Sequence, residues 1–132
     1  MISMTQQKQK YQLEFVIRSS PKILYNFIST ADGLGEWFAD DVTINSDGTF
    51  TFRWDKSTAS ARIMSKKDLK MIRFKWLDDE ESESFFEFEI IQHDITSDVG
   101  LIITDFGAPD ELKENTLLWN SQVNKLMKLL GS

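Results

Sequence analysis

The segment "PDELKENTLLWNSQVNKLMKLLG" at residues 109–131 carries the pattern that decides the fold. Its apolar residues recur at steps of four and three, which places their side chains on one face of an α-helix. Acidic residues gather near its start and lysines near its end, as the helix dipole favours, and Gly131 follows as a stop signal. We expect one helix of about 20 residues. Its apolar stripe comprises Leu112, Thr116, Trp119, Val123, Leu126 and Leu130.

The sequence before this helix supplies a surface for the stripe to cover. Short segments alternate apolar and polar residues, the period of a strand with one buried face. We expect an α+β fold in which a curved antiparallel sheet of about six or seven strands wraps around the C-terminal helix, because a twisted sheet with one apolar face curls and must be covered. The clearest strand segments are "YQLEFVIR" (11–18), "TFTFRWD" (49–55), "KMIRFKWLD" (70–78), "FFEFEIIQHDI" (85–95) and "VGLIITDF" (99–106).

Two short helices are expected after the first strand. In "SSPKILYNFIST" (19–30), Ser20 is a candidate N-cap and Pro21 fits the first helical position. In "ADGLGEWFADDV" (31–42), the glycines permit a kink before a second short helix that carries Trp37 and Phe38. We expect these two aromatic residues to close one end of an apolar interior.

Composition restricts the classes of function. The chain has 132 residues, which favours a single domain over residues 1–132, with residues 1–9 as a loosely ordered N-terminus. It has no cysteine, which excludes disulfides and thiolate chemistry. A net charge of -6 disfavours nucleic acid and anionic membranes, and the acidic run at residues 78–84 is expected to be a solvated connection. No segment is apolar enough for membrane insertion or a signal peptide, so we expect a cytoplasmic protein.

The order of these elements resembles the helix-grip fold of START-like domains, the superfamily also grouped as SRPBCC or Bet v-like proteins. The similarity runs from residue 11 to residue 131. Within the superfamily the chain is most similar to homologues of the activator of the heat-shock chaperone ATPase and to small bacterial START-like proteins. It departs from them in one turn, where "SDG" (46–48) has one glycine and relatives often have two. The similarity is carried by "SPKILYNFIST", "LGEWFADDV", "GTFTFRW" and "LLWNSQVNKLMKLLG".

The resemblance implies a cavity between the sheet and the long helix for a hydrophobic or amphipathic small molecule, such as a lipid. Large aromatic residues fall on the faces that converge beneath the helix, and two amides border its apolar stripe. The alternatives are that the aromatic rings simply fill a packed core and that the amides are solvated. The candidate ligand-binding residues are Trp37, Phe38, Phe52, Trp54, Phe74, Trp76, Asn115, Trp119, Gln122 and Val123.

Three functions stay open at this stage. The first is non-catalytic binding of a small molecule, and the second is a protein-interaction module, which the resemblance suggests is chaperone-related. The third is a small cyclase- or hydrolase-type enzyme, which requires ionisable groups inside the cavity. Candidates for such groups, if the assignment of strand faces is shifted by one residue, are Arg62, Glu87, Glu89 and Asp105.

No catalytic residue, metal site or cofactor is expected. His93 is the only histidine, and we expect it to form a surface ion pair beside Asp94. Asp40 and Asp41 are adjacent, so in a strand they point to opposite faces and do not form an acid–base pair. The chain is expected to be a monomer, or a homodimer paired through an exposed edge strand at residues 42–45.

Overall fold

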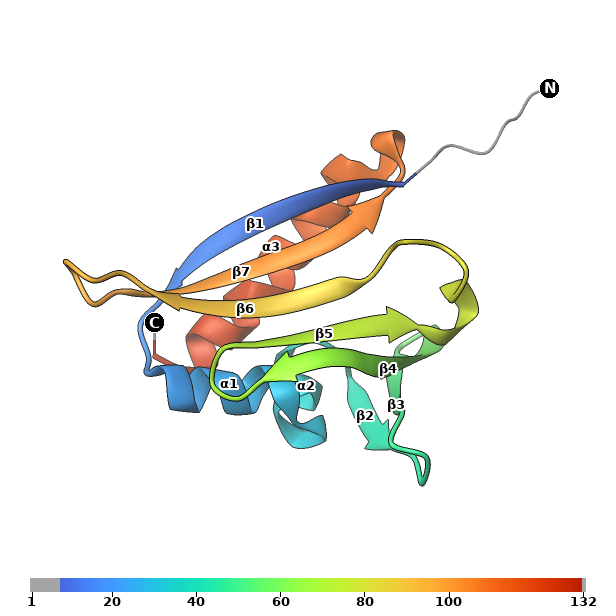
Figure 1. Ribbon diagram of the computed structural model, residues 1–132, viewed down its shortest axis with the longest axis horizontal. Helices are drawn as coiled ribbons and strands as arrows, with labels where there is room; N and C mark the ends of the chain where they lie inside the picture. The colour runs from blue at the N-terminus through green and yellow to red at the C-terminus, as the bar shows by residue number, and fades with distance from the viewer. Residues whose placement is uncertain (1–7, 132) are drawn as a thin grey trace.

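A computed structural model describes residues 8–131 and places seven strands in one antiparallel sheet (Figure 1). The strand order across the sheet is β1-β7-β6-β5-β4-β3-β2, so the first and last strands of the chain pair at one edge. The sheet predicted from the alternating segments is therefore confirmed. The strands are β1 (Gln9–Ile17), β2 (Asp41–Ile44), β3 (Phe50–Trp54), β4 (Ser57–Lys67), β5 (Met71–Trp76), β6 (Phe86–Gln92) and β7 (Val99–Gly107).

The long helix α3 (Leu112–Leu129) lies behind β7 and β6 in Figure 1 and covers one face of the sheet. A 3-10 turn, η2 (Pro109–Glu111), leads into it. The central residues of the predicted stripe, Trp119, Val123 and Leu126, are buried. The curved antiparallel sheet around a long C-terminal helix confirms the helix-grip, α+β prediction.

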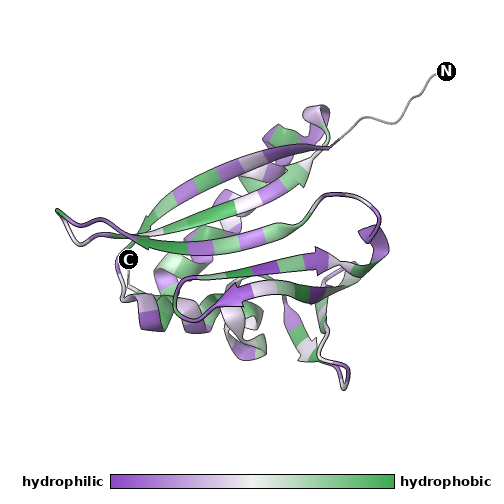
Figure 2. Ribbon diagram, viewed as in Figure 1, coloured by the Kyte–Doolittle hydropathy of each residue, from purple (hydrophilic) through white to green (hydrophobic). Residues whose placement is uncertain are grey.

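Hydrophobic and hydrophilic residues alternate along several of the strands in Figure 2, the pattern of strands with one apolar face. Phe52, Phe74 and Phe88 are fully buried, each from a different strand. Burial of aromatic rings this large dominates the stability of a domain of this size. The assignment of strand faces from the alternating pattern is thus correct for these three strands.

Two short helices, α1 (Pro21–Ser29) and α2 (Ala31–Trp37), follow β1 as predicted. The Ser20 hydroxyl caps α1 by accepting a hydrogen bond from the backbone N–H of Ile23 at 3.2 Å. The break between the helices lies at Thr30, not at the glycines. Thr30 has an extended backbone, and its hydroxyl accepts a hydrogen bond from the Gly33 N–H at 2.9 Å, which caps α2.

Gly33 has a different role from the predicted kink, because it lies inside α2. A Cβ at this position would lie 2.3 Å from the Asn26 carbonyl oxygen and 2.6 Å from the Phe27 Cα. Only a residue without a side chain therefore permits this close approach of α2 to α1.

The two ends of the chain are described to different extents. The expected loose N-terminus at residues 1–9 lies largely outside the described residues, which begin at residue 8. Gln9 already belongs to β1 and pairs with Gly107 of β7.

Within residues 8–131, no helix combines the length and apolarity needed to cross a membrane.

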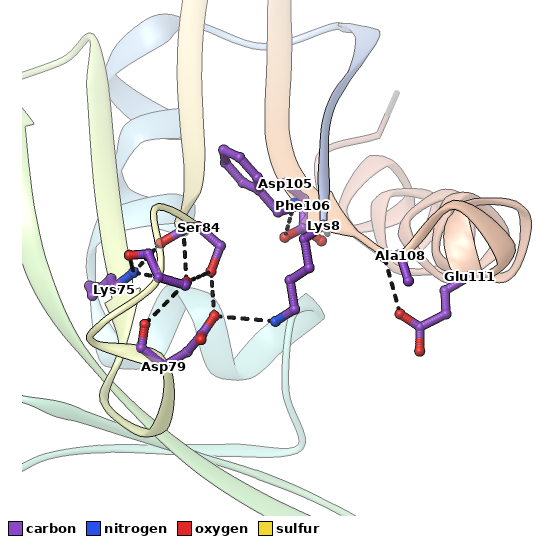
Figure 3. Close-up of polar contacts among 9 residues, drawn as sticks. Lys8, Lys75, Asp79, Ser84, Asp105, Phe106, Ala108 and Glu111 are labelled. Atoms are coloured by element: carbon purple, nitrogen blue, oxygen red, sulfur yellow. Dashed lines mark hydrogen bonds and ion pairs between the residues drawn. The ribbon is translucent and has the colours of Figure 1, made fainter. Parts of the chain in front are cut away.

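The acidic connection between β5 and β6 is more ordered than a simple solvated loop. It begins with a 3-10 turn, η1 (Leu77–Asp79), and folds over the side chain of Lys75, which is only 3% exposed. The Lys75 ammonium donates to the carbonyl oxygens of Ser82 and Ser84, both at 2.6 Å. Asp79 accepts hydrogen bonds from the Ser84 hydroxyl and from the Lys8 ammonium (Figure 3).

These contacts change the acidity of Asp79. Hydrogen bonds from Ser84 and Ser82, together with Lys8, lower the pKa of Asp79 to about 2. The carboxylate is therefore ionised at neutral pH and connects the acidic loop to the start of β1. The sequence pattern showed the charge of this loop but could not show that a buried lysine organises it.

Candidate functional site

A pocket of about 480 Å³ opens between α3 and the sheet. Its volume falls within the range of small-molecule sites, roughly 300 to 1,000 Å³. It lies where α3, the end of α2 and the strands β3 to β7 converge. The lining residues are Phe38, Trp54, Ser57, Trp76, Phe86, Asp105, Asn115, Leu118, Trp119 and Gln122.

Aromatic rings form most of the pocket wall. Phe38 stacks on Trp119 with ring centroids 5.6 Å apart, and on Phe86 at the same separation. Trp76 stacks on Phe86 at 4.6 Å, and Trp54 meets the edge of Phe38 at 5.6 Å. Rings that hold one another in stacked and edge contacts have fixed positions, so the wall is a preorganised apolar surface.

The opposite part of the interior is packed solid. Trp37, Phe52, Phe74 and Val123 were candidate ligand-binding residues, but each is at most 1% exposed and none lines the pocket. The Trp37 indole N–H donates to the Phe27 carbonyl at 2.8 Å, and its ring contacts Phe88. The structure thus separates the predicted Trp37 and Phe38 pair, with Phe38 in the pocket wall and Trp37 in the core.

The two predicted amides, Asn115 and Gln122, both line the pocket from α3. Gln122 donates its side-chain N–H to the Phe38 carbonyl at 2.7 Å, and the Trp54 indole N–H donates to the same oxygen at 2.8 Å. Asn115 lies close to β7 because Gly107 has no side chain; a Cβ there would lie 2.6 Å from the Asn115 Nδ2. Both amides are half-buried, so neither is a fully solvated flank residue.

Asp105 of β7 is the ionisable residue at this pocket. Its Oδ2 accepts hydrogen bonds from the Tyr11 hydroxyl and the Trp119 indole N–H, both at 3.0 Å. Its Oδ1 accepts a bond from the backbone N–H of Phe106 at 2.8 Å (Figure 3). Burial raises the pKa of Asp105, and the hydrogen bonds from these donors partly oppose the rise.

Asp105 was named from the sequence only as a candidate that required a shifted strand face. It reaches the interior without any shift, because the inward residues of β7 alternate through Leu101 and Ile103. Tracing this alternation two residues further along "VGLIITDF" would have placed its carboxylate on the apolar face. The signal was therefore present in the sequence.

The other ionisable candidates lie outside the pocket. Arg62 forms an exposed ion pair with Glu80 at 2.8 Å. Glu87 pairs with Arg73 at 2.7 Å on the outer face of the sheet, and Glu89 shares that face because it lies two residues further along β6. None of these three groups lines the pocket.

His93 and Asp41 have partners at the surface. His93 lies 3.5 Å from Glu14 rather than pairing with Asp94, because the β6–β7 hairpin brings it beside β1. Asp41 lies 3.5 Å from Arg53 across the β2–β3 pair. Among residues 8–131, no cluster of three or more His, Cys, Asp or Glu side chains has an arrangement that suits a metal ion.

The comparisons with known proteins agree with this architecture. A model of the START-like superfamily domain matches residues 4–132, and the chain belongs to this superfamily. Domains with this fold generally bind hydrophobic ligands or mediate interactions. No match was found among curated proteins.

Solved structures of bacterial proteins are similar over nearly the whole chain. A Bacteroides fragilis protein solved by NMR is 40% identical, covering 93% of this chain and 91% of that one with a TM-score of 0.65. The Aha1 dimer from Colwellia psychrerythraea is 15% identical, covering 92% and 96% with a TM-score of 0.75. An uncharacterised Bacillus thuringiensis protein is 9% identical, covering 94% and 100% with a TM-score of 0.78. The last two show likeness of fold alone.

Proposed function

We propose that this chain binds a hydrophobic or amphipathic small molecule in the pocket between α3 and the sheet, without transforming it. The observation that carries the proposal is the pocket itself, about 480 Å³ of open space beside a core that is otherwise packed. Protein interiors are normally filled to the density of organic crystals, so open space walled by large aromatic rings suggests a binding site. The pocket also has a few fixed polar groups, which amphipathic ligands require.

The exposed apolar residue Leu118 supports this proposal. Its side chain is 59% exposed on α3, and it also lines the pocket. An exposed leucine at a pocket rim extends the apolar path of an entering ligand. Exposed apolar residues also lie away from this pocket: Ile23 and Leu69 border a second hollow on α1, a surface of the kind that the protein-interaction hypothesis requires. Interaction with a protein partner, a cytoplasmic location and a monomeric or homodimeric state all stay predictions.

Asp105 favours a second candidate function, acid–base catalysis on the bound molecule. A buried carboxylate with a raised pKa is the property that the enzyme hypothesis required. Among the described residues, however, no second ionisable group lines the pocket to complete a proton relay. We therefore favour binding over catalysis.

Native mass spectrometry of the protein purified from its own host tests both functions. An excess mass that is lost on denaturation and recovered in an organic extract is the result expected for a binding protein. When the extracted molecule is incubated again with ligand-free protein, the mass of that molecule should stay unchanged. Its conversion to a product would instead support the enzyme hypothesis.

A matched pair of variants tests whether the pocket is the binding site. Ser57 lines the pocket, whereas its neighbour Thr58 does not and points to the other face of β4. Ser57→Phe should fill part of the pocket and weaken binding of octanol, while Thr58→Phe should leave it unchanged. Binding is followed by NMR of the indole N–H groups, where Trp54 and Trp119 should shift and the core residue Trp37 should not. Equal octanol binding by both variants would contradict the proposal.

A further inference from the structure

The charges that line the pocket indicate the chemistry of its ligand. Among the described residues that line it, Asp105 is the one charged side chain, and the others are aromatic, aliphatic, hydroxyl or amide side chains. Lys8, the lysine that affects the pKa of Asp105, pairs with Asp79 at 3.2 Å. A carboxylate headgroup entering the pocket would therefore meet a like charge and no lining cation.

The Asp105 carboxylate has capacity left for a ligand. Its two oxygens offer about four acceptor positions. Tyr11 and Trp119 occupy Oδ2, and the Phe106 N–H occupies one position on Oδ1. At least one acceptor position on Oδ1 is free of protein donors within the described residues. The three donors also fix the carboxylate in place, so a ligand group meets a preset acceptor rather than a mobile chain.

The aromatic wall favours a cationic headgroup. The faces of Trp and Phe rings carry partial negative charge and attract cations, with Trp the strongest. Trp119 both stacks in the wall and donates to Asp105, so its ring lies directly beside the carboxylate. An aromatic wall joined to a carboxylate is the arrangement by which proteins recognise organic ammonium groups.

We propose that the pocket selects a cationic amphiphile, an amine or quaternary ammonium group on an apolar body, whose charge lies against Asp105 beside the aromatic wall of the pocket. This inference rests on the proposed function, since it names the class of molecule that the same pocket takes. Burial of Asp105 without a cation disfavours its ionised form, and a bound ammonium group would restore it. The nearby groups that also affect this carboxylate are Tyr11 and Lys8.

Three probes of equal chain length test the preference: octyltrimethylammonium, octanol and octanoate. Each is titrated into the native protein at about pH 8, well above the usual pKa range of a carboxyl group. The quaternary ammonium stays charged at every pH, so a change in its affinity with pH reports a change in the charge of the protein. We expect it to bind at least about tenfold more tightly than octanoate, with octanol between them.

A matched pair of variants locates the charge. Asp105→Asn keeps an oxygen acceptor for Tyr11 and Trp119 and removes the charge, and should weaken octyltrimethylammonium about tenfold while leaving octanol unchanged. Asp110→Asn removes an exposed charge of η2 that does not line the pocket, and should change neither affinity. The ring currents and indole N–H shift of Trp119 report the position of the headgroup.

The outcomes separate this inference from the proposed function. Equal affinities for the three probes, or tighter binding of octanoate, would overturn the cationic preference while the pocket remained a binding site. Unchanged octyltrimethylammonium affinity in a folded Asp105→Asn variant would also overturn it. If no probe binds, both proposals fall. The comparison of probes on the native protein stands even if the variant does not fold.

Discussion

Substitution of Trp37 by alanine tests whether the interior is solid beside the pocket. The indole is 1% exposed, its ring contacts Phe38 and Phe88, and its N–H donates to the Phe27 carbonyl at 2.8 Å. Removal of a buried Trp ring costs about 3 to 5 kcal/mol, and the cost rises with the cavity that remains. Loss of the indole also leaves the Phe27 carbonyl without its donor, which adds to the cost when water does not replace it. We expect a loss of about 3 to 5 kcal/mol in the free energy of unfolding, from a total of about 5 to 15 for a typical domain.

Equilibrium urea unfolding, with an unchanged dependence on urea, measures this loss. Trp37→Phe keeps a six-membered ring but removes the N–H donor and the rest of the indole, so it should cost less, about 1 to 3 kcal/mol. Trp76→Ala is the pocket control, because that ring borders open space and its removal leaves a smaller new void. A loss below about 1 kcal/mol for Trp37→Ala would refute the conclusion that this half of the interior is packed.

Three further substitutions have defined outcomes. Gly33→Ala should lower the free energy of unfolding by about 1 to 3 kcal/mol, because its Cβ would collide with the Phe27 backbone, and thermal unfolding measures it. Asp79→Asn should be less stable than the native protein above about pH 4, because the hydrogen bond from Ser84 lowers the pKa of Asp79 in the folded state. This difference should disappear as the pH falls toward 2, so the melting temperatures of the two proteins should converge there. Asp105→Asn should gain stability relative to the native protein as pH rises from about 4 to 7, because the raised pKa makes the ionised form of Asp105 unfavourable when the protein is folded. A relative loss of stability over this pH range would contradict the argument.

The fold was largely predictable because it rests on periodic patterns. The alternation of residues 11–17 produced β1, and the steps of four and three that include Trp119 and Val123 produced α3. These patterns are local, and burial on one face enforces them strongly. The break between α1 and α2 was predicted at the glycines but lies at Thr30. Threonine and glycine both occur at helix ends, and only the close packing of α2 on α1 shows that Gly33 lies inside a helix.

The site was only partly predictable, because open space between helices and strands leaves no pattern in the local sequence. Inward-facing rings are alike in sequence, so Trp54 and Phe52 were equal candidates although only Trp54 lines the pocket. Which of two neighbouring inward rings is packed depends on the residues that approach from other strands and helices. The amides Asn115 and Gln122 both line the pocket, since their position beside the helix stripe follows from helical spacing alone, and their contact with a ligand stays a prediction.

Phe38 explains how a packed core and an open pocket share one interior. It follows the last residue of α2, stacks between Trp119 and Phe86, and presents its carbonyl oxygen to the side-chain donors of both Trp54 and Gln122. One backbone oxygen therefore ties β3 and α3 to the end of α2. Because both donors are satisfied in this way, a movement of the Trp54 ring or the Gln122 side chain into the open space would break a part-buried hydrogen bond, which is costly to leave unmade. The pair of aromatic residues at 37 and 38 thus divides two tasks: Trp37 fills the core, and Phe38 forms the wall at which the core ends.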